Sequence, residues 1–221
     1  YGVDGGMTQF CVVPEDIIHT LPDDVSFEAG SLCEPAAVAV HAVYDSVRPE
    51  PGDLVVVIGA GAIGLLVAQI AKDFGATVII TGLTHDRLRL DKAKQLGIDY
   101  AVDTQTEDLE ALVMKLSENM GADLVYECSG SAPGVRTGMS MLKKMGSLVQ
   151  IGLTKPTLEI EYSMLTGKQI RLVGTFGHKW KSWEIALHLI QAGKLNTQAL
   201  ITHTFPLSEW EEAFRIAEAQ E

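Results

Sequence analysis

The sequence has few cysteines and few basic residues. Its 3 cysteines in 221 residues, Cys11, Cys33 and Cys128, form no CxxC pair. This scattered, odd set argues against a disulfide framework or a structural zinc finger, and it favours a reducing compartment, so we expect a cytoplasmic protein. The 17 Lys and Arg residues are outnumbered by 29 Asp and Glu, for a formal net charge of −12. Because this balance repels nucleic-acid phosphates and anionic membranes, we expect neither as a partner.

The sequence also shows no signal-peptide pattern and no uninterrupted membrane span. The opening YGVDGG begins without Met and lacks a positively charged start followed by an apolar stretch. The run 54–71 is uncharged and long enough to suggest a transmembrane helix. Three glycines divide this run into a strand pattern and a helix pattern, so we reject the transmembrane interpretation.

From residue 54 onward, short β-branched runs alternate with amphipathic helix patterns. Apolar strands that alternate with helices predict a parallel sheet covered on both faces. Six strands in two mononucleotide-binding halves predict an α/β, doubly wound Rossmann fold. Strands are expected at 54–59, 77–81, 100–102, 122–128, 147–152 and 170–175, and helices at 61–74, 86–96, 109–119 and 133–145.

The two flanks do not follow this alternation. The N-terminal flank has a strand-like FCVV at 10–13 without companion strands, and the C-terminal flank has two amphipathic helix patterns, at 180–192 and 208–219. Neither flank is expected to make a core of its own. We therefore predict remnants of a second domain at 1–34 and 177–221, and a dinucleotide-binding domain at 35–176.

A glycine fingerprint joins the first predicted strand to the first predicted helix. Gly59, Gly61 and Gly64 match GxGxxG, with Ala62 and Ile63 between the last two glycines. The first glycine makes the tight turn, the second lets the backbone approach a pyrophosphate, and the third allows close packing, with the helix N-terminus facing the anion. Between a strand and a helix this pattern indicates dinucleotide binding. The alternatives are a glycine-rich turn without a ligand and a methyltransferase loop, and the latter is disfavoured because the strand ends without an acid.

Further motifs extend over nearly the whole chain. They are DGGMTQF (4–10), LPDDVSFEAGSLCEPAAVAVHA (21–42), AKQLGIDYAVD (93–103), YECSG (126–130), GSLVQIGL (146–153) and ITHTFPLSEWEEAF (201–214). In this order, together with VIGAGAIG, they resemble the zinc-dependent medium-chain dehydrogenase/reductase family, and within it the sorbitol dehydrogenase-like polyol branch. The resemblance implies an NAD(P)-linked oxidation of a secondary alcohol or polyol to a ketone. It also implies that the part of the catalytic domain with most zinc ligands is not in this sequence.

The resemblance gives Glu34 a role at a metal. In the polyol branch, a glutamate at this position bonds the zinc-bound water or occasionally the zinc itself. The alternative is an acid at a helix start before Pro35, which is favourable to the helix dipole without any metal. One carboxylate does not make a zinc site, so we expect zinc in the parent enzyme and an inactive chain here. Glu34-Pro35 disfavours a quinone-reductase-like member without zinc.

The resemblance also places nicotinamide-side contacts at the ends of the fourth, fifth and sixth predicted strands, where open α/β sheets bind ligands. For Cys128 the alternative is a small buried residue. The Arg-Tyr pair common in the polyol branch is replaced by Gly177-His178, which argues against sorbitol itself as substrate. His178 is either a substrate-facing residue or an exposed loop histidine. The expected contacts are Cys128, Ser129, Gly130, Gly152, Leu153, Thr175 and Phe176.

The second predicted strand ends in Gly82, where an acid is expected. In NAD-specific members this acid hydrogen-bonds the adenosine ribose and repels a 2′-phosphate. Gly82 removes both effects, and Thr84, His85 and Arg87 offer polar and cationic groups to a phosphate. Asp86 is interpreted as a helix cap. We therefore predict NADP as the cofactor, with NAD or dual use as the alternatives; Arg87 is not diagnostic, because NAD-using members also have such a residue.

The sixth predicted strand, 170–175, matches a strand that family members pair across a dimer. The resemblance therefore implies a homodimer or homotetramer through this strand. The alternative function, from a different class, is a cofactor-binding or dimerisation module that does not catalyse a reaction as it stands.

Overall fold

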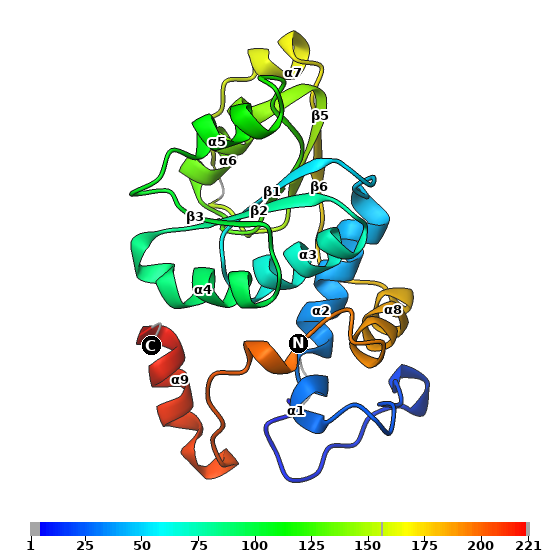
Figure 1. Ribbon diagram of the computed structural model, residues 1–221. Coiled ribbons are helices and arrows are strands. Elements are labelled where there is room, and N and C mark those ends of the chain that lie inside the picture. Colours follow the sequence, from blue (N-terminus) through cyan, green and yellow to red (C-terminus); the bar gives the residue numbers. More distant parts are fainter. Residues whose placement is uncertain (1–4, 156, 220–221) are drawn as a thin grey trace.

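One sheet of six parallel strands organises the computed structural model, which describes residues 5–155 and 157–219. The strand order is β3-β2-β1-β4-β5-β6 (Figure 1). This is the order of a doubly wound Rossmann sheet, so the predicted fold class is confirmed. Asp4, with which the DGGMTQF motif starts, lies outside the described residues. The strands are β1 (Leu54–Ile58), β2 (Thr77–Gly82), β3 (Tyr100–Asp103), β4 (Ala122–Glu127), β5 (Leu142–Gln150) and β6 (Arg171–Gly174).

Helices cover both faces of the sheet, because its apolar side chains alternate between two cores. Val55 and Val57 lie in one core, and Val56 and Ile58 lie in the other. The first core is covered by α2 (Cys33–Val40), α3 (Ala62–Asp73), α4 (Arg87–Gln95) and α8 (Trp180–Gln191). The second core is covered by α5 (Leu109–Leu116) and α6 (Ala132–Met141). The remaining α-helices are α1 (Phe27–Gly30), α7 (Ser163–Gly167) and α9 (Trp210–Ala219).

The uncharged run 54–71 forms β1, the fingerprint turn and most of α3. All of β1 is buried, which is why this central parallel strand reads as a continuous apolar run. Within the described ranges, none of the helices combines the length and the apolar character needed to cross a bilayer.

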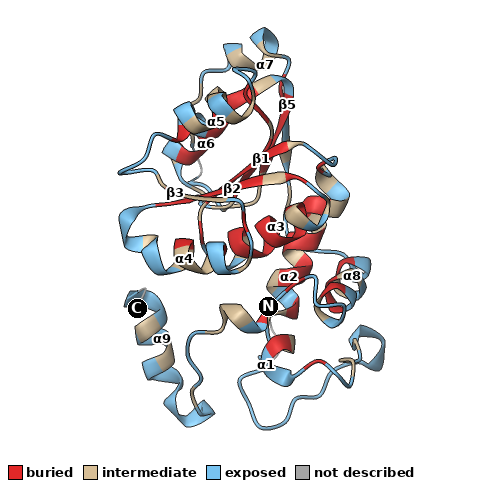
Figure 2. Ribbon diagram, viewed as in Figure 1, coloured by how far each residue is buried: buried red, intermediate tan, exposed pale blue. Residues whose placement is uncertain are grey.

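The two flanks pack differently. Ala186 and Leu189 of α8 belong to the same core as β1 and α3. In contrast, α9 has no buried residue and stands apart from the sheet (Figures 1 and 2). The strand-like FCVV at 10–13 has no regular secondary structure, because β propensity does not make a strand where no neighbouring strand takes up its backbone hydrogen bonds. The domain boundaries at 34/35 and 176/177 stay a prediction.

The junction between α6 and β5 lies earlier than the sequence suggests. The helix expected over 133–145 ends at Met141, and β5 begins at Leu142, which pairs with Ala122 and is 1% exposed. The register then shifts before the pairing of Leu124 with Ser147. Residues in this irregular stretch lack the alternation that identifies a strand, so the sequence pattern could not separate them from the helix.

Candidate functional site

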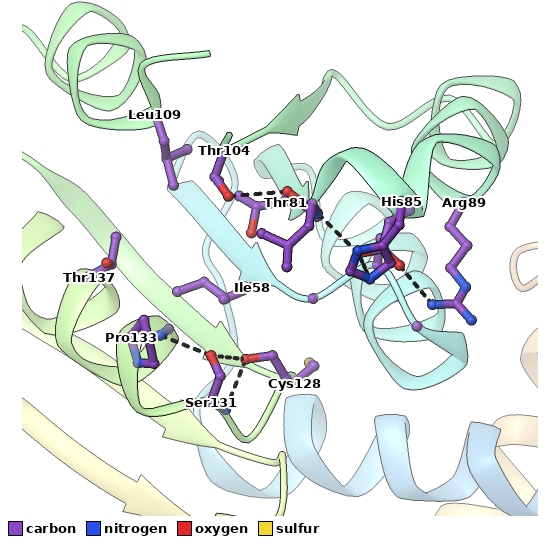
Figure 3. Close-up of a pocket in the computed structure, with 18 residues that line it drawn as sticks. Ile58, Thr81, His85, Arg89, Thr104, Leu109, Cys128, Ser131, Pro133 and Thr137 are labelled. Carbon is purple, nitrogen blue, oxygen red and sulfur yellow. Dashed lines mark hydrogen bonds and ion pairs between the residues drawn. The ribbon is translucent and has the colours of Figure 1, made fainter. Parts of the chain in front are cut away.

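A cleft of about 400 Å³ opens at the carboxyl ends of β1, β2 and β4. It lies where the strand order reverses between β1 and β4, the position at which open α/β sheets bind ligands. Figure 3 shows Thr81 and His85 on one side of the cleft and Cys128 and Pro133 on the other. Of the predicted cofactor residues, the cleft is lined by Gly59, Gly61, Gly82, Cys128 and Ser129.

The fingerprint glycines have the geometry that dinucleotide binding needs. Gly59 has a φ of +103°, in the left-handed region that favours glycine. A Cβ on Gly64 would lie 1.9 Å from the Gly59 carbonyl oxygen, so only glycine allows the helix to pack this closely. A Cβ on Gly61 would meet no atom within 4 Å, which leaves this part of the cleft wall open to a ligand. Gly61 is also the N-cap of α3, with no side chain to occupy the first-turn N–H groups at Ala62, Ile63 and Gly64.

The space at Gly82 is filled by the neighbouring Asp86. A Cβ on Gly82 would lie 3.0 Å from Asp86 Cβ and 3.3 Å from its Oδ2. The carboxylate of Asp86 accepts a hydrogen bond from the Leu83 N–H (3.0 Å) and another from Arg89 (2.7 Å). Asp86 is the N-cap residue of α4. Its side chain makes no capping bond to the backbone of α4, but through the Leu83 N–H it caps the short 3-10 turn Thr84–Asp86 that precedes α4. An acid is therefore present at the end of β2, already engaged by Leu83 and Arg89.

Of the three residues expected to offer groups to a phosphate, Thr84 and Arg87 do not line the cleft. Thr84 donates to Asp103 Oδ2 (2.7 Å), a bond that lowers the pKa of the Asp103 carboxyl. The Arg87 side chain is 86% exposed and lies 4.0 Å from Asp91. His85, the third of these residues, lines the cleft, and so does Arg89, which was not predicted. The sequence did not distinguish Arg89 from Arg87, because the choice depends on where the first turn of α4 points.

The loops after β4 and β5 are packed closely together. A Cβ on Gly130 would lie 2.3 Å from the Leu153 carbonyl oxygen, and a Cβ on Gly152 would lie 2.2 Å from the Gly130 nitrogen. Gly130 also has a φ of +66°. Burial raises the pKa of the Cys128 thiol, which disfavours its thiolate form. These glycines keep the two loops in contact beside the cleft.

At the end of β6, Thr175 and Phe176 lie outside the residues that line the cleft. The Thr175 hydroxyl is buried and finds no hydrogen-bond partner in the described part of the chain. Phe176 is 84% exposed, and Leu153 is 80% exposed. The open wall at Gly61 and the unpartnered Thr175 hydroxyl fit a dinucleotide that extends across the sheet from β2 toward β6.

Glu34 and His178 lie next to each other, although the sequence separates them widely. His178 Nε2 lies 3.4 Å from Glu34 Oε1, and Trp183 Nε1 donates to His178 Nδ1 (2.9 Å). Because Nδ1 accepts, the proton of a neutral His178 is on Nε2, where it faces the carboxylate. His178 is an exposed residue of the loop before α8, and its side chain, which contacts Trp183 and Glu34, is 27% exposed.

Zinc does not fit the described residues taken alone. Across residues 5–155 and 157–219, no three His, Cys, Asp or Glu side chains come together in a group that could hold a metal ion. Glu34 beside His178 leaves a tetrahedral zinc ion without enough ligands. No chemical step through zinc is therefore assigned to this chain.

A further candidate, Glu127, was missed by the sequence analysis. It is the last residue of β4 and is 0% exposed. The available signal was an acid that follows the run Leu124–Tyr126 at the end of a central strand, immediately before Cys128.

The chain is similar to known polyol dehydrogenases. It is 41% identical over 219 residues to sorbitol dehydrogenase of Halalkalibacterium halodurans, a match that covers 99% of this chain and 64% of the relative. It is 38% identical over 212 residues to D-arabitol-phosphate dehydrogenase of Enterococcus avium, covering 96% of this chain and 60% of the relative. The chain thus spans less than two thirds of the length of these curated relatives.

Two solved structures have the same fold over most of the chain. The crystal structure of 2R,3R-butanediol dehydrogenase from Bacillus subtilis matches with a TM-score of 0.80 and 30% identity, covering 89% of this chain and 56% of that one. A protein described as a zinc-binding dehydrogenase from Sinorhizobium meliloti 1021, bound to NADP, matches with a TM-score of 0.86 and 28% identity, covering 95% and 62%. The family model for zinc-binding dehydrogenases matches residues 62–192, which is more than half of this chain. The chain therefore belongs to the zinc-binding dehydrogenase family.

Proposed function

We propose that this chain binds the nicotinamide dinucleotide of an NAD(P)-linked alcohol or polyol dehydrogenase. The cleft at the ends of β1, β2 and β4, with its open wall at Gly61, is the observation that carries the proposal. The names of the sorbitol and arabitol-phosphate dehydrogenases support a polyol or other secondary alcohol as the substrate of the whole protein. The NADP-bound neighbour supports a nicotinamide cofactor.

In this proposal the chain's own residues bind and orient the cofactor. The pyrophosphate lies against Gly59 and Gly61, where the first-turn N–H groups of α3 neutralise its charge. The adenosine half extends toward Gly82, and the nicotinamide half toward Cys128 and Ser129. When bound, the nicotinamide supplies the acceptor for the hydride that leaves the alcohol carbon as the ketone forms. The residues beside the nicotinamide half are Gly130, Gly152, Leu153, Thr175 and Phe176.

Within this function we propose NADP as the preferred cofactor. Gly82 has no carboxylate, and the nearby Asp86 already accepts from Leu83 and Arg89. The Arg89 guanidinium and the His85 imidazole are then the groups that can reach a 2′-phosphate at this end of the cleft. In the competing arrangement, Asp86 releases Arg89 and accepts hydrogen bonds from the adenosine ribose. That arrangement favours NAD.

A fluorescence titration of this chain with NADPH and, separately, with NADH tests both the dinucleotide site and the preference for NADP. Clearly tighter binding of NADPH supports a 2′-phosphate site. Equal or tighter binding of NADH overturns the preference but leaves the dinucleotide site intact. If neither dinucleotide binds, the proposal that this chain forms a cofactor site is overturned.

We further propose that the whole protein is a zinc-dependent, cytoplasmic dehydrogenase, and that this chain alone does not turn over substrate. The family supports the zinc dependence, and the lack of a three-residue metal group in the described residues supports the inactivity. The free cysteines Cys11, Cys33 and Cys128 support a reducing compartment. Alcohol oxidation by this chain with NAD(P) and added zinc would overturn the inactivity. The alternative, a binding or dimerisation module, is favoured by β6, which pairs with β5 and ends the sheet.

A further inference from the structure

Glu127 is a buried acid whose hydrogen-bonding capacity is filled entirely by neutral donors. It is 0% exposed. Its Oε1 accepts from the Ser129 N–H (3.0 Å) and from the Ser129 hydroxyl. Its Oε2 accepts from the Gly130 N–H (2.9 Å) and from Gln150 Nε2 (2.6 Å). A carboxylate only accepts hydrogen bonds, so four donors on two oxygens match its ionised form.

Burying the Glu127 carboxylate costs free energy, so its place in the structure calls for a functional explanation. A carboxylate loses much of its hydration when it enters the protein interior, and only well-placed donors compensate. An amide or an apolar residue in this position would avoid that cost. Three of the four donors to Glu127 come from the loop after β4, and the fourth is the side chain of Gln150, the last residue of β5. Glu127 therefore organises the segments that follow these two strands beside the nicotinamide side of the cleft.

The first of these loops is residues 128–131, between β4 and α6. Two successive N–H groups of this loop, at Ser129 and Gly130, are directed at the carboxylate. The Ser129 hydroxyl also lies 2.9 Å from the hydroxyl of Ser131, the N-cap of α6, which accepts from the Gly134 N–H (3.0 Å). The carboxylate is thus linked to the start of α6 through side chains of the loop.

The second loop follows β5. Gln150 donates to Glu127 and also to the Gly152 carbonyl oxygen (2.8 Å). The Gly152 N–H in turn donates to the Glu127 carbonyl oxygen (2.8 Å). Since Gly130 and Gly152 are in close contact, a single residue, Glu127, holds both loops together.

We propose that Glu127 is a positioning residue for the cofactor, which shapes the nicotinamide side of the cleft by holding residues 128–131 against 150–153. The adenosine side is built by different contacts, among Leu83, Asp86 and Arg89 on the far side of β1. Loss of Glu127 therefore weakens binding of the nicotinamide half and leaves the adenosine half unaffected. This inference rests on the proposed function.

The test is Glu127→Gln, which keeps the shape but directs an N–H₂ group at two donors. Isothermal titration calorimetry compares the dinucleotide that the unmodified chain binds more tightly with its adenosine half, adenosine 2′,5′-bisphosphate for NADPH or 5′-AMP for NADH. We expect affinity for the dinucleotide to fall about tenfold or more, because hydrogen bonds to a charged group are lost. Affinity for the adenosine half should stay unchanged. Glu110→Gln, at an exposed position of α5, is the matched control and should change neither.

Gln150→Leu is the second variant in case Glu127→Gln does not fold. It removes one donor to Glu127 and the bond to Gly152, and it should show the same selective loss, smaller in size. Equal weakening of the dinucleotide and its adenosine half, or no weakening in either variant, overturns the positioning role. Failure of the unmodified chain to bind any dinucleotide overturns the proposed function instead, so the two failures are distinguishable.

Discussion

At the scale of single residues, Gly61 and Gly64 belong to one motif but have different physical roles. Gly61 has φ −70° and ψ 179°, which alanine adopts readily, and its Cβ would extend into free space lining the cleft. Gly61→Ala should therefore leave the free energy of unfolding within about 0.5 kcal/mol and weaken dinucleotide binding at least about tenfold. Gly64→Ala should cost several kcal/mol, because its Cβ would lie 1.9 Å from the Gly59 oxygen.

Urea unfolding and fluorescence titration of the two glycine variants check this separation. A Gly61→Ala protein that binds the dinucleotide normally would show that the ligand does not approach this wall. A Gly64→Ala protein of normal stability would show that α3 can move away from the turn without cost.

A second prediction for single residues is that Arg89, and not Arg87, contacts the 2′-phosphate of NADP. Arg89→Ala should lower the affinity for NADPH about tenfold and change that for NADH little, because a charged hydrogen bond to the 2′-phosphate is lost. Arg87→Ala is the matched control, since Arg87 is exposed and does not line the cleft. Parallel titrations of both variants with both dinucleotides measure the difference. Equal losses for NADPH and NADH on Arg89→Ala would contradict a 2′-phosphate contact.

Residue roles that depend on local spacing could be predicted from the sequence, whereas those that depend on contacts between loops could not. The turn at Gly59 and the close packing at Gly64 follow from the fingerprint spacing, and the structure shows both. The occupation of the space beside Gly82 by Asp86, and the loops gathered around Glu127, depend on how separate segments meet. Composition and periodicity do not indicate which separate segments come into contact in the folded chain.

At the scale of elements, Tyr126 connects β4 to the end of the π-helical turn His41–Ser46. It is 0% exposed, and its hydroxyl donates to the Val47 carbonyl oxygen (2.5 Å). Tyr126→Phe should lower the free energy of unfolding by about 1 kcal/mol, the typical net value of such a bond. Urea unfolding measures this, and dinucleotide affinity should be unchanged. An unchanged unfolding free energy would mean that the connection contributes nothing to stability.

The burial of Tyr126 also predicts a dependence of stability on pH. Burial raises the pKa of Tyr126 above its usual value of 10.0, so the folded chain keeps a proton that the unfolded chain releases. This contribution to stability is complete below pH 10 and decreases as the pH rises above it. The Phe variant should therefore lose less stability than the unmodified chain when the pH is raised above 10.

Element types were predictable where a periodic pattern was long, and less so at irregular junctions. The buried strand β1 and the amphipathic helix α3 follow directly from their patterns. The start of β5 was missed because its pairing with β4 shifts register before Ser147. FCVV shows the converse, a strand-like composition without a partner strand.

At the scale of the molecule, the alternating pattern was sufficient for the sheet but not for the flanks. Ala186 and Leu189 give α8 an ordinary amphipathic face, and nothing in that face indicates that it packs in the core of the sheet. The face of α9 looks similar in sequence, yet Trp210 is 49% exposed and Phe214 51% exposed. Which apolar face finds a partner depends on the path of the connecting chain, which hydrophobic periodicity does not encode.

Self-association through β6 is the prediction at this scale. β6 pairs with β5 at the edge of the sheet, and Leu172 on it is 42% exposed, so a second copy could extend the sheet there. We expect a dimer in size-exclusion chromatography with light scattering. Leu172→Lys should give monomers, because charge on an edge strand blocks pairing, whereas Leu88→Lys, on an 83% exposed position of α4, should not. A monomeric unmodified chain, or a dimer that both variants leave intact, would exclude β6 as the association surface of this chain.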